Sequence, residues 1–343
     1  MSILQCVQSV GFALILVCSM AVQAQFSPFR PLPDQPPIPE DNPMTAAKIS
    51  LGQQLYFDPR LSVNHSLSCN TCHNVMGDGA DGRALSVGAS GKMTKRNAIS
   101  LWNAAYNTIF FWDGAALSLE DAIQVHLLDE TIMAMESKAQ LEERLAVVQG
   151  YKSTFRKVYG DNSLNYDNVV KSLAAYVRTL KTQDSPFDQY LRGNTADFSE
   201  QAKRGFHQYI ELGCASCHFW VNMAGPVPGL AFQVGEGFYE LFPNHTGSKY
   251  DAMYGLTDDI GRYQVTGDET DKLMWRVASL RNVALTGPYF HNGSVDTLEE
   301  AIRVMAKVQL RHELAEDIVA DIAAFLNTLS GEFPEQTMPR LPE

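Results

Sequence analysis

Two short cysteine motifs stand out as residues that could carry chemistry. Residues 69–73 read Cys-Asn-Thr-Cys-His, and residues 214–218 read Cys-Ala-Ser-Cys-His. The C-x-x-C-H spacing is typical of covalent haem attachment, in which two thiols bond to the porphyrin and the adjacent histidine binds the iron. A lone C-x-x-C could instead be a redox dithiol or half of a zinc site, but two copies, each followed at once by histidine, favour two haem c groups. The predicted haem-binding residues are Cys69, Cys72, His73, Cys214, Cys217 and His218.

A second self-similarity lies outside these motifs. Residues 100–123 align without gaps on residues 279–302, at a constant offset of 179, and ten of the 24 positions are identical. Both segments end in Leu-Glu-x-Ala-Ile, a helix start. The repeat indicates duplication of one haem domain, so equivalent positions should lie similarly around the two haems.

The repeat predicts what stands opposite each proximal histidine. Three residues beyond the aligned segments, Met305 falls opposite His126. Methionine is the usual sixth ligand of an electron-transfer haem c, where it raises the reduction potential. If Met305 binds the second haem, His126 lies over the distal face of the first. The same overlay places Trp112 opposite His291.

Helices are expected to position these residues. A helix over residues 45–57, with Thr45 as its cap, precedes the first motif, and another beginning near Phe198 precedes the second. Residues 223–265 predict a long loop because Gly and Pro punctuate them. The expected fold class is all-α, with two cytochrome c-like haem domains related by duplication, long loops and little strand. Further helices are predicted over residues 118–127, 138–148, 151–159, 165–181, 184–192, 297–309 and 313–329.

The same patterns predict a division of the chain. Its first 24 residues hold no Asp, Glu, Lys or Arg, and their apolar run is too short to span a membrane comfortably. This run ends in Val-Gln-Ala, which suits a signal peptidase; a retained N-terminal anchor is the alternative. The predicted segments are a signal peptide (1–24), a Pro-rich arm (25–44), an N-terminal haem domain (45–193), a C-terminal haem domain (194–333) and a tail (334–343).

Charge and cysteine content narrow the possible partners and the compartment. Removal of the signal peptide would leave four cysteines, all within the haem motifs, and would keep the formal net charge of −12. An acidic chain argues against nucleic acid and anionic membrane as partners, so no stable membrane association is expected after cleavage. A small basic redox protein remains compatible with this charge. An exported protein with haem c is expected in the periplasm.

Several longer motifs carry a resemblance to a known family. They are Gly-x-x-Leu-Tyr-Phe-Asp (52–58), Arg-Asn-Ala (96–98), Phe-Trp-Asp-Gly (111–114) and Leu-Arg-Asn-Val-Ala-Leu-Thr-Gly-Pro-Tyr-Phe-His-Asn-Gly (280–293). With these motifs the sequence resembles the bacterial di-haem cytochrome c peroxidase and MauG family over nearly all of the chain that follows the predicted signal peptide. The resemblance implies that the C-terminal haem is a low-spin electron store bound by His218 and Met305. It also implies that peroxide reacts at the N-terminal haem on His73, and that Trp112 relays electrons or holes between the haems.

The resemblance further implies a calcium ion between the domains. In the family an asparagine and backbone oxygens hold this ion, and the matching positions are Asn97, Thr286 and Pro288. Oxygen-only ligands suit calcium. Without the resemblance these residues would be interpreted as turn formers.

Three positions depart from the family pattern around the N-terminal haem. The loop histidine that caps the resting haem in the peroxidases is Ala89 here, the distal glutamate is Ile132 and the distal glutamine is Ala122. His126 stands where relatives tend to carry proline. It is predicted to replace the glutamate in moving the peroxide proton, and the alternative is that it binds the iron as a sixth ligand. MauG also lacks the histidine that caps the resting haem, so its absence here favours a MauG- or MbnH-like branch of the family.

The predicted function is that of a periplasmic di-haem oxidoreductase that reacts with hydrogen peroxide. Electrons could come from a small redox protein in peroxide detoxification, or the enzyme could oxidise residues of a protein substrate, as MauG does. The competing hypothesis is a non-catalytic di-haem electron carrier, which would follow if His126 closed the N-terminal haem to peroxide.

Overall fold

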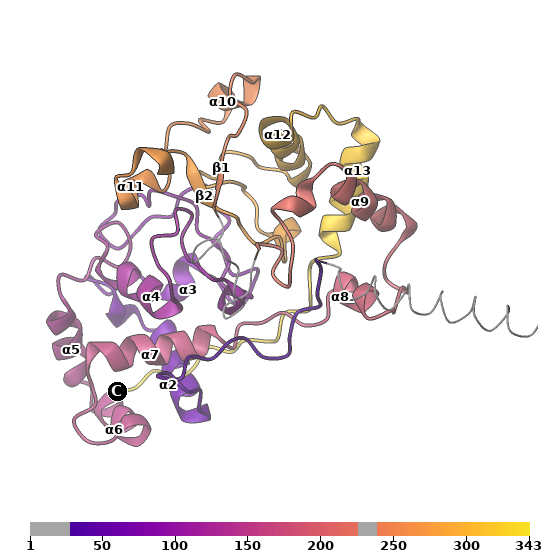
Figure 1. Ribbon diagram of the computed structural model, residues 1–343. Helices are drawn as coiled ribbons and strands as arrows, with labels where there is room; N and C mark the ends of the chain where they lie inside the picture. Colours follow the sequence, from indigo (N-terminus) through magenta and orange to yellow (C-terminus); the bar gives the residue numbers. More distant parts are fainter. Residues whose placement is uncertain (1–27, 226–238) are drawn as a thin grey trace, which may run out of the picture.

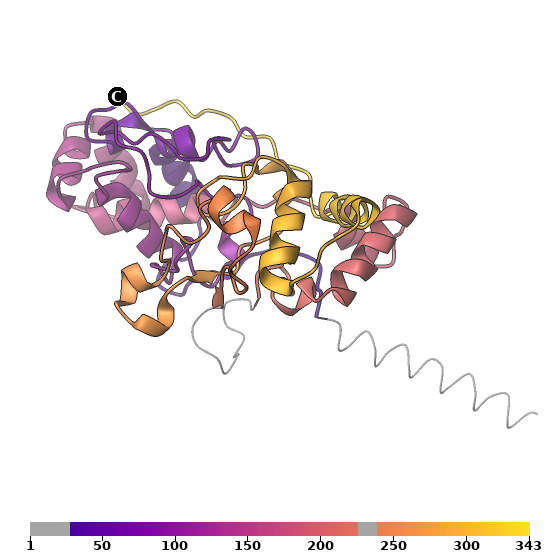
Figure 2. The ribbon, with the colours of Figure 1, turned by 90° about the horizontal axis from the view of Figure 1, so that it is seen from above.

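The computed structural model describes residues 28–225 and 239–343, so the predicted signal peptide lies outside the described residues. Within these two ranges no helix is long and apolar enough to cross a membrane. The fold is mostly helical, as predicted, and its helices form two groups at opposite ends of the molecule (Figures 1 and 2).

The N-terminal group contains the helices that precede and follow the first cysteine motif. Thr45 caps the first of them, since its side chain accepts a hydrogen bond from the Lys48 amide. Ser118 caps α4 in the same way, through the Asp121 amide. The helices of this part are α2 (Ala46–Tyr56), α3 (Cys69–Cys72), α4 (Leu119–Leu128), α5 (Lys138–Ala146), α6 (Gln149–Tyr159) and α7 (Tyr166–Val177).

The C-terminal group contains α8 (Pro186–Leu191), α9 (Glu200–Glu211), α12 (Leu298–Leu310) and α13 (Glu316–Asn327). The prediction of a loop over residues 223–265 was wrong for part of that span. The structure has β1 (Tyr239–Leu241), α10 (Lys249–Met253) and α11 (Tyr263–Thr266) there, and β1 pairs antiparallel with β2 (Met274–Arg276). Elements of three to five residues are too short to show a hydrophobic period.

Each group is built on one close helix crossing that requires glycine. In the N-terminal group α2 crosses α7, and a Cβ atom added at Gly52 would lie 1.9 Å from the Ser172 carbonyl oxygen. In the C-terminal group α9 crosses α13, and a Cβ atom at Gly205 would lie 1.8 Å from the Asp321 carbonyl oxygen. Because backbone atoms cannot move aside as a flexible side chain can, any side chain at either position forces the helices apart.

We expect Gly205→Ala to destabilise the protein. Alanine gains about 1 kcal/mol of helix propensity over glycine, but overpacking of a tight contact costs roughly 1–3 kcal/mol and occasionally more, and this contact is with backbone. Thermal unfolding of the haem-loaded protein measures the effect. His207→Ala, at an exposed position of the same helix, should change the unfolding free energy by less than about 0.5 kcal/mol. Equal melting temperatures of the Gly205→Ala variant and the wild type would show that the helix crossing tolerates a Cβ atom.

The internal repeat predicted from the sequence is confirmed in the backbone. Asn103 and Asn282 both adopt the left-handed conformation, with φ of 65° and 61°. Phe111 and Phe290 do the same, with φ of 65° and 68°. Helices α4 and α12 also begin 179 residues apart. Unusual backbone angles at equivalent positions indicate that the two segments share one local fold, so the overlay of His126 on Met305 rests on structure as well as on sequence.

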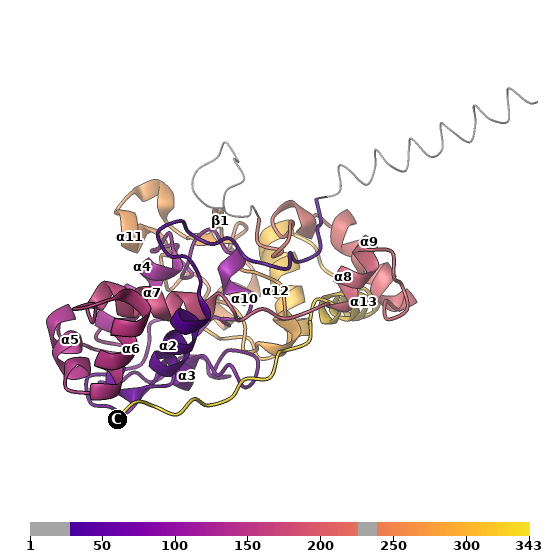
Figure 3. The ribbon, with the colours of Figure 1, turned by 90° about the horizontal axis from the view of Figure 1, so that it is seen from below.

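The Pro-rich arm connects the two helical groups. It begins in the C-terminal group, where the ring of Phe29 lies 5.9 Å from that of Phe187 between centroids. It then crosses to the N-terminal group (Figure 3), where the Asn42 side chain donates to the Glu120 carboxylate over 2.7 Å. The arm is therefore anchored by buried residues near both of its described ends and contributes to both groups.

The C-terminal tail connects the groups a second time. After α13 it runs back along the N-terminal helices and ends near α6 (Figures 1 and 3). The ring of Phe333 lies 5.1 Å from that of Trp102, and the Gly150 amide donates to the Glu343 carbonyl over 2.8 Å. The Pro-rich arm and the C-terminal tail thus both connect the two groups. The exact division into domains stays a prediction.

Candidate haem sites

The two motif histidines are held in the same way. His73 follows α3, and its Nδ1 lies 3.0 Å from the Ile99 carbonyl oxygen. His218 follows the 3-10 turn Cys214–Ser216, and its Nδ1 lies 3.1 Å from the Ala278 carbonyl oxygen. Ile99 and Ala278 are again 179 residues apart. When Nδ1 donates to a carbonyl, the tautomer is fixed and Nε2 is left free to bind a metal.

A buried tyrosine fixes the backbone of each motif. The Tyr56 hydroxyl donates to the His73 carbonyl over 2.5 Å, and the Tyr209 hydroxyl donates to the His218 carbonyl over 2.6 Å. Burial raises the pKa of both phenols well above the ordinary value, so they stay protonated donors. The sequence interpretation missed these residues. The available signal was a Gly-x-x-x-Tyr pattern on the helix before each motif, since each tyrosine follows a crossing glycine by four positions.

The electrostatics of the motifs suit haem attachment better than a redox dithiol or a zinc site. Burial raises the pKa of the Cys69 thiol to about 12 and that of the Cys214 thiol to about 11. Dithiol redox chemistry and zinc binding both use thiolates, which these surroundings disfavour. Over the two described ranges, no group of three or more His, Cys, Asp or Glu side chains could hold a bare metal ion.

The imidazoles of the motifs are kept neutral. Burial, and secondarily the neighbouring imidazole of His126, lowers the pKa of His73 to about 3. Burial also lowers the pKa of His218. A neutral imidazole offers its Nε2 lone pair to iron without first losing a proton, so both residues are ready to act as ligands near neutral pH.

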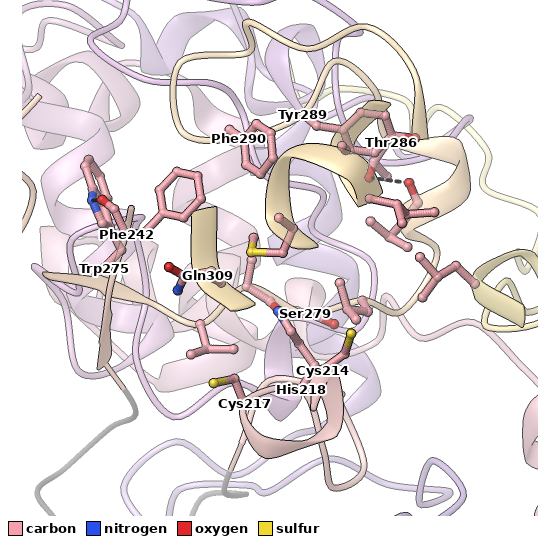
Figure 4. A pocket seen from close by; sticks show the side chains of 18 of the residues that line it. Cys214, Cys217, His218, Phe242, Trp275, Ser279, Thr286, Tyr289, Phe290 and Gln309 are labelled. Atoms are coloured by element: carbon pink, nitrogen blue, oxygen red, sulfur yellow. Dashed lines mark hydrogen bonds between the residues drawn. The ribbon is translucent and has the colours of Figure 1, made fainter. Parts of the chain in front are cut away.

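A cavity of about 260 Å³ lies beside the second motif (Figure 4). His218 and Met305 both line it, the first from the cysteine motif and the second from α12. The structure therefore brings the two predicted ligands of the C-terminal haem to one apolar cavity. Figure 4 shows the other labelled lining residues, with Cys214, Cys217 and His218 near Ser279, and Phe242, Trp275, Tyr289 and Phe290 farther along the wall.

Two polar groups in the wall of this cavity fit a haem, which carries two carboxylates. His291 is buried, and its Nε2 atom has no hydrogen-bond partner. Arg276 is 5% exposed, and its Nε donates to the Phe111 carbonyl, but no carboxylate among the described residues pairs with it. Burial lowers the pKa of Arg276 to about 10. A buried cation without an anion and a buried imidazole nitrogen without a hydrogen-bond partner are both costly, and haem carboxylates can serve both groups.

We expect Arg276→Gln to lower the reduction potential of the C-terminal haem. A cation stabilises the reduced, less positive haem, and two charges about 10 Å apart interact by about 1.7 kcal/mol at an effective dielectric constant of 20, or roughly 70 mV. A spectroelectrochemical titration measures the shift. Arg204→Gln removes a guanidinium from the exposed face of α9 and should leave the potential nearly unchanged. Equal shifts in the two variants would mean that Arg276 acts only through overall charge.

The N-terminal site differs from the C-terminal one in the residue opposite the motif histidine. The rings of His73 and His126 lie 5.7 Å apart between centroids, with an angle of 62° between their planes. His126 also stacks on Phe111, at 5.1 Å and 19°, and its Nδ1 lies 2.7 Å from the Ala122 carbonyl oxygen. The structure thus brings His126 to the first motif, as the repeat predicts.

The other positions considered around this site offer no acid or base. The Ala89 amide donates to the Ile132 carbonyl over 2.7 Å, so the two positions that depart from the family pattern are bonded to each other. Glu130 is exposed and pairs with Lys92 at the surface, and Glu136 is exposed. Of His126, Glu130 and Glu136, it is His126 whose ring contacts the motif histidine.

Trp112 lies where the two repeat segments meet. Its Nε1 donates to the Asn97 carbonyl over 2.9 Å, and its own carbonyl accepts from the Arg276 amide over 2.9 Å. The backbone amide of Asn97 in turn donates to the His291 carbonyl. Trp112 also lines the cavity beside His218. The indole also packs against the buried cluster of Phe242 and Trp275, so Trp112 contacts both halves of the molecule.

The three residues proposed to hold calcium all line one cavity. Asn97, Thr286 and Pro288 all line the cavity described above. The side-chain nitrogen of Asn97 donates to the Arg83 carbonyl over 2.8 Å. The side-chain oxygen of Asn97 is then the atom that could face a cation. One amide oxygen and backbone carbonyls form the kind of neutral oxygen set that calcium accepts.

Comparison with known proteins gives consistent matches. The family model described as di-haem cytochrome c peroxidase matches residues 46–196. The chain is 38% identical to the cytochrome c551 peroxidase of Pseudomonas aeruginosa, over 97% of this chain and 93% of that protein. It is 31% identical to the methylamine utilization protein MauG of Methylorubrum extorquens, over 90% of this chain and 86% of that protein.

A solved structure agrees with these sequence matches. The crystal structure of a MauG-like protein associated with microbial copper homeostasis superimposes with a TM-score of 0.72 at 29% identity. The match covers 88% of this chain and 95% of that one. Similarity over nearly the whole length means that both haem-motif halves, and not one cytochrome module alone, are shared.

Proposed function

Because this chain belongs to the family of di-haem cytochrome c peroxidases and MauG proteins, we propose that its two haem sites divide the work of a peroxide-dependent oxidoreductase. Family membership implies two haem c groups. In this proposal peroxide reacts at the N-terminal haem on His73, and the C-terminal haem on His218 and Met305 stores an electron. When bound, a haem c supplies the reaction with peroxide and the electron storage.

The observation that carries this proposal is the difference between two otherwise equivalent sites. Duplication gives both motif histidines the same tyrosine support and the same carbonyl partner for Nδ1. Opposite them, one site has Met305 and the other has His126. A methionine ligand suits an electron-transfer haem, whereas an imidazole can accept and return a proton near neutral pH. The asymmetry therefore supports one electron-transfer site and one reactive site.

Proton movement at the N-terminal site is assigned to His126. Cleavage of peroxide needs a proton moved from one oxygen to the other, and a positioned side chain contributes about 10²–10⁴-fold to such a transfer. Nδ1 of His126 is held by the Ala122 carbonyl, so Nε2 is the atom that takes and gives the proton. Phe111, stacked on the ring, holds the imidazole in place.

Electron or hole transfer between the sites is assigned to Trp112. Its indole donates to the Asn97 carbonyl in the N-terminal half and packs against the buried cluster that contains Phe242 and Trp275 in the C-terminal half. Asn97, Thr286 and Pro288 would hold a calcium ion beside this contact and so fix the two halves relative to each other. Treatment with a chelator should then slow transfer between the haems.

Two uses of the oxidising power remain open in this proposal. Electrons could come from a small redox protein, or the enzyme could oxidise side chains of a protein substrate, as its MauG-like features suggest. The formal charge of −12 supports a basic partner in either case, since opposite charge accelerates encounter. The predicted signal peptide supports the periplasm as the place of action.

Peroxide consumption tests the proposal against a plain electron carrier. Hydrogen peroxide is added in stoichiometric amount to the protein with both haems oxidised and, separately, with the C-terminal haem reduced. We expect peroxide to be consumed in at least one of these states, together with a change in the optical spectrum of the C-terminal haem. A carrier would leave both the peroxide and the spectrum unchanged in either state.

A further inference from the structure

We propose that His126 is a removable sixth ligand of the N-terminal haem, so that α4 itself carries the cap that closes the peroxide site in the resting protein. This inference rests on the proposed function in placing the peroxide reaction at the haem on His73. It takes up the second of the two sequence-based roles of His126, that of a sixth ligand, and adds that this ligand can leave the iron.

The distance between the two rings carries the inference. A metal–imidazole bond is about 2 Å long, so two imidazoles bound to opposite faces of one iron have centroids roughly 6 Å apart. The rings of His73 and His126 lie 5.7 Å apart. A histidine that acts only on bound peroxide must leave room for two oxygen atoms and a hydrogen bond of about 2.7 Å, which places its ring roughly 3 Å or more farther away. The observed spacing fits a pair of ligands.

The orientation of both rings supports the same conclusion. The Nδ1 atom of His73 is occupied by the Ile99 carbonyl, and that of His126 by the Ala122 carbonyl. Each ring therefore has only Nε2 free. A histidine whose Nδ1 donates to a backbone carbonyl has the tautomer and the fixed ring direction that metal ligands show. Phe111 is stacked 5.1 Å from His126 and covers one face of its ring.

The loop carrying Ala89 cannot supply a different cap. Its Ala89 amide is bonded to the Ile132 carbonyl over 2.7 Å. A Cβ atom at the neighbouring Gly88 would lie 2.0 Å from the Thr131 carbonyl oxygen, so the loop backbone packs directly on residues 131–132. The alanine side chain has no ligand atom. A cap from α4 therefore takes the place of a cap from the loop.

The position of His126 allows the cap to leave. It lies in the last turn of α4, between the exposed side chain of Val125 and the buried Leu127. The carbonyl groups of this turn accept from the Asp129, Met133 and Met135 amides, so the turn itself stays formed. Rotation of the His126 side chain alone is enough to move the imidazole away from His73. The freed ring then lies beside the face at which peroxide binds, where it can serve in proton transfer.

Spectroscopy of the oxidised, haem-loaded protein tests the cap. We expect two low-spin haems in the wild type by electron paramagnetic resonance, and conversion of one of them to high spin in His126→Ala. Cyanide is the probe for an open face. If nine-tenths of the molecules are capped, the apparent affinity for cyanide is reduced tenfold, so the variant should bind cyanide at least about tenfold more tightly.

Two further variants serve as controls. His207→Ala removes an exposed histidine from α9 and should leave the spin state and cyanide affinity as they are. His126→Gly should be high-spin at one haem and return to low spin when free imidazole is added, which shows that the protein is folded and that the lost group is the ligand.

The outcomes separate the cap from the proposed function. A high-spin N-terminal haem in the wild type, unchanged by His126→Ala, would overturn the cap while leaving peroxide consumption intact. Conversion of low spin to high spin in a protein that consumes no peroxide in any state would support the cap and overturn the peroxide function.

Discussion

Trp112→Phe is expected to slow the oxidation of the C-terminal haem by peroxide by roughly two orders of magnitude, equivalent to about 2.7 kcal/mol in the barrier. Phenylalanine keeps much of the aromatic packing but loses the Nε1 donor to the Asn97 carbonyl, and a benzene ring is harder to oxidise than an indole. Rapid mixing with peroxide, followed at wavelengths specific to each haem, measures the effect. The resting spectra of both haems should stay as in the wild type.

Trp275 is the matched control for this experiment. It is also buried, lines the same cavity and stacks on His291 at 4.1 Å. However, its Nε1 donates to the Phe242 carbonyl over 3.1 Å, within the C-terminal half, whereas Nε1 of Trp112 donates to the N-terminal half. Trp275→Phe should therefore leave the transfer rate nearly unchanged. If the Trp275 variant is the slow one, the relay runs through Trp275 and the assignment of Trp112 is wrong.

The helices could be predicted because their signals are local. Thr45 and Ser118 cap α2 and α4 where the sequence places them. The predicted helix over residues 165–181 ends earlier, at Val177, because the segment that follows leaves the helix to pair with another part of the chain. The Thr182 amide there donates to the Asn103 side chain. A long-range contact of this kind has no trace in a hydrophobic period.

The haem-binding residues could be predicted from spacing, whereas the residues that support them could not. Tyr56 and Tyr209 differ from other buried tyrosines only in which carbonyl their hydroxyls reach, and that depends on the helix crossing. Arg276 is an ordinary arginine in the sequence, and its importance comes from burial without a carboxylate among the described residues. The role of His126 depends on a ring distance of 5.7 Å to His73, which no alignment of the repeat provides.

Met305→His is expected to lower the reduction potential of the C-terminal haem by on the order of 0.2 V, within the roughly 0.8 V that axial ligands control. Methionine opposite histidine raises the potential, and the cavity that Met305 shares with His218 is the place where the exchange acts. A spectroelectrochemical titration of both haems measures it. The Met253→His variant, at an exposed methionine of α10, should leave the potential unchanged.

The same variant also tests the repeat as an explanation of function. With histidine at 305, the C-terminal site would hold the pair of residue types that His73 and His126 form in the N-terminal site, 179 positions earlier. If the ligand opposite the motif histidine sets the difference between the two haems, the difference between their reduction potentials should become smaller in the variant. The C-terminal haem should stay low-spin. If the two potentials stay as far apart as in the wild type, surroundings such as Arg276 dominate the difference and the ligand does not.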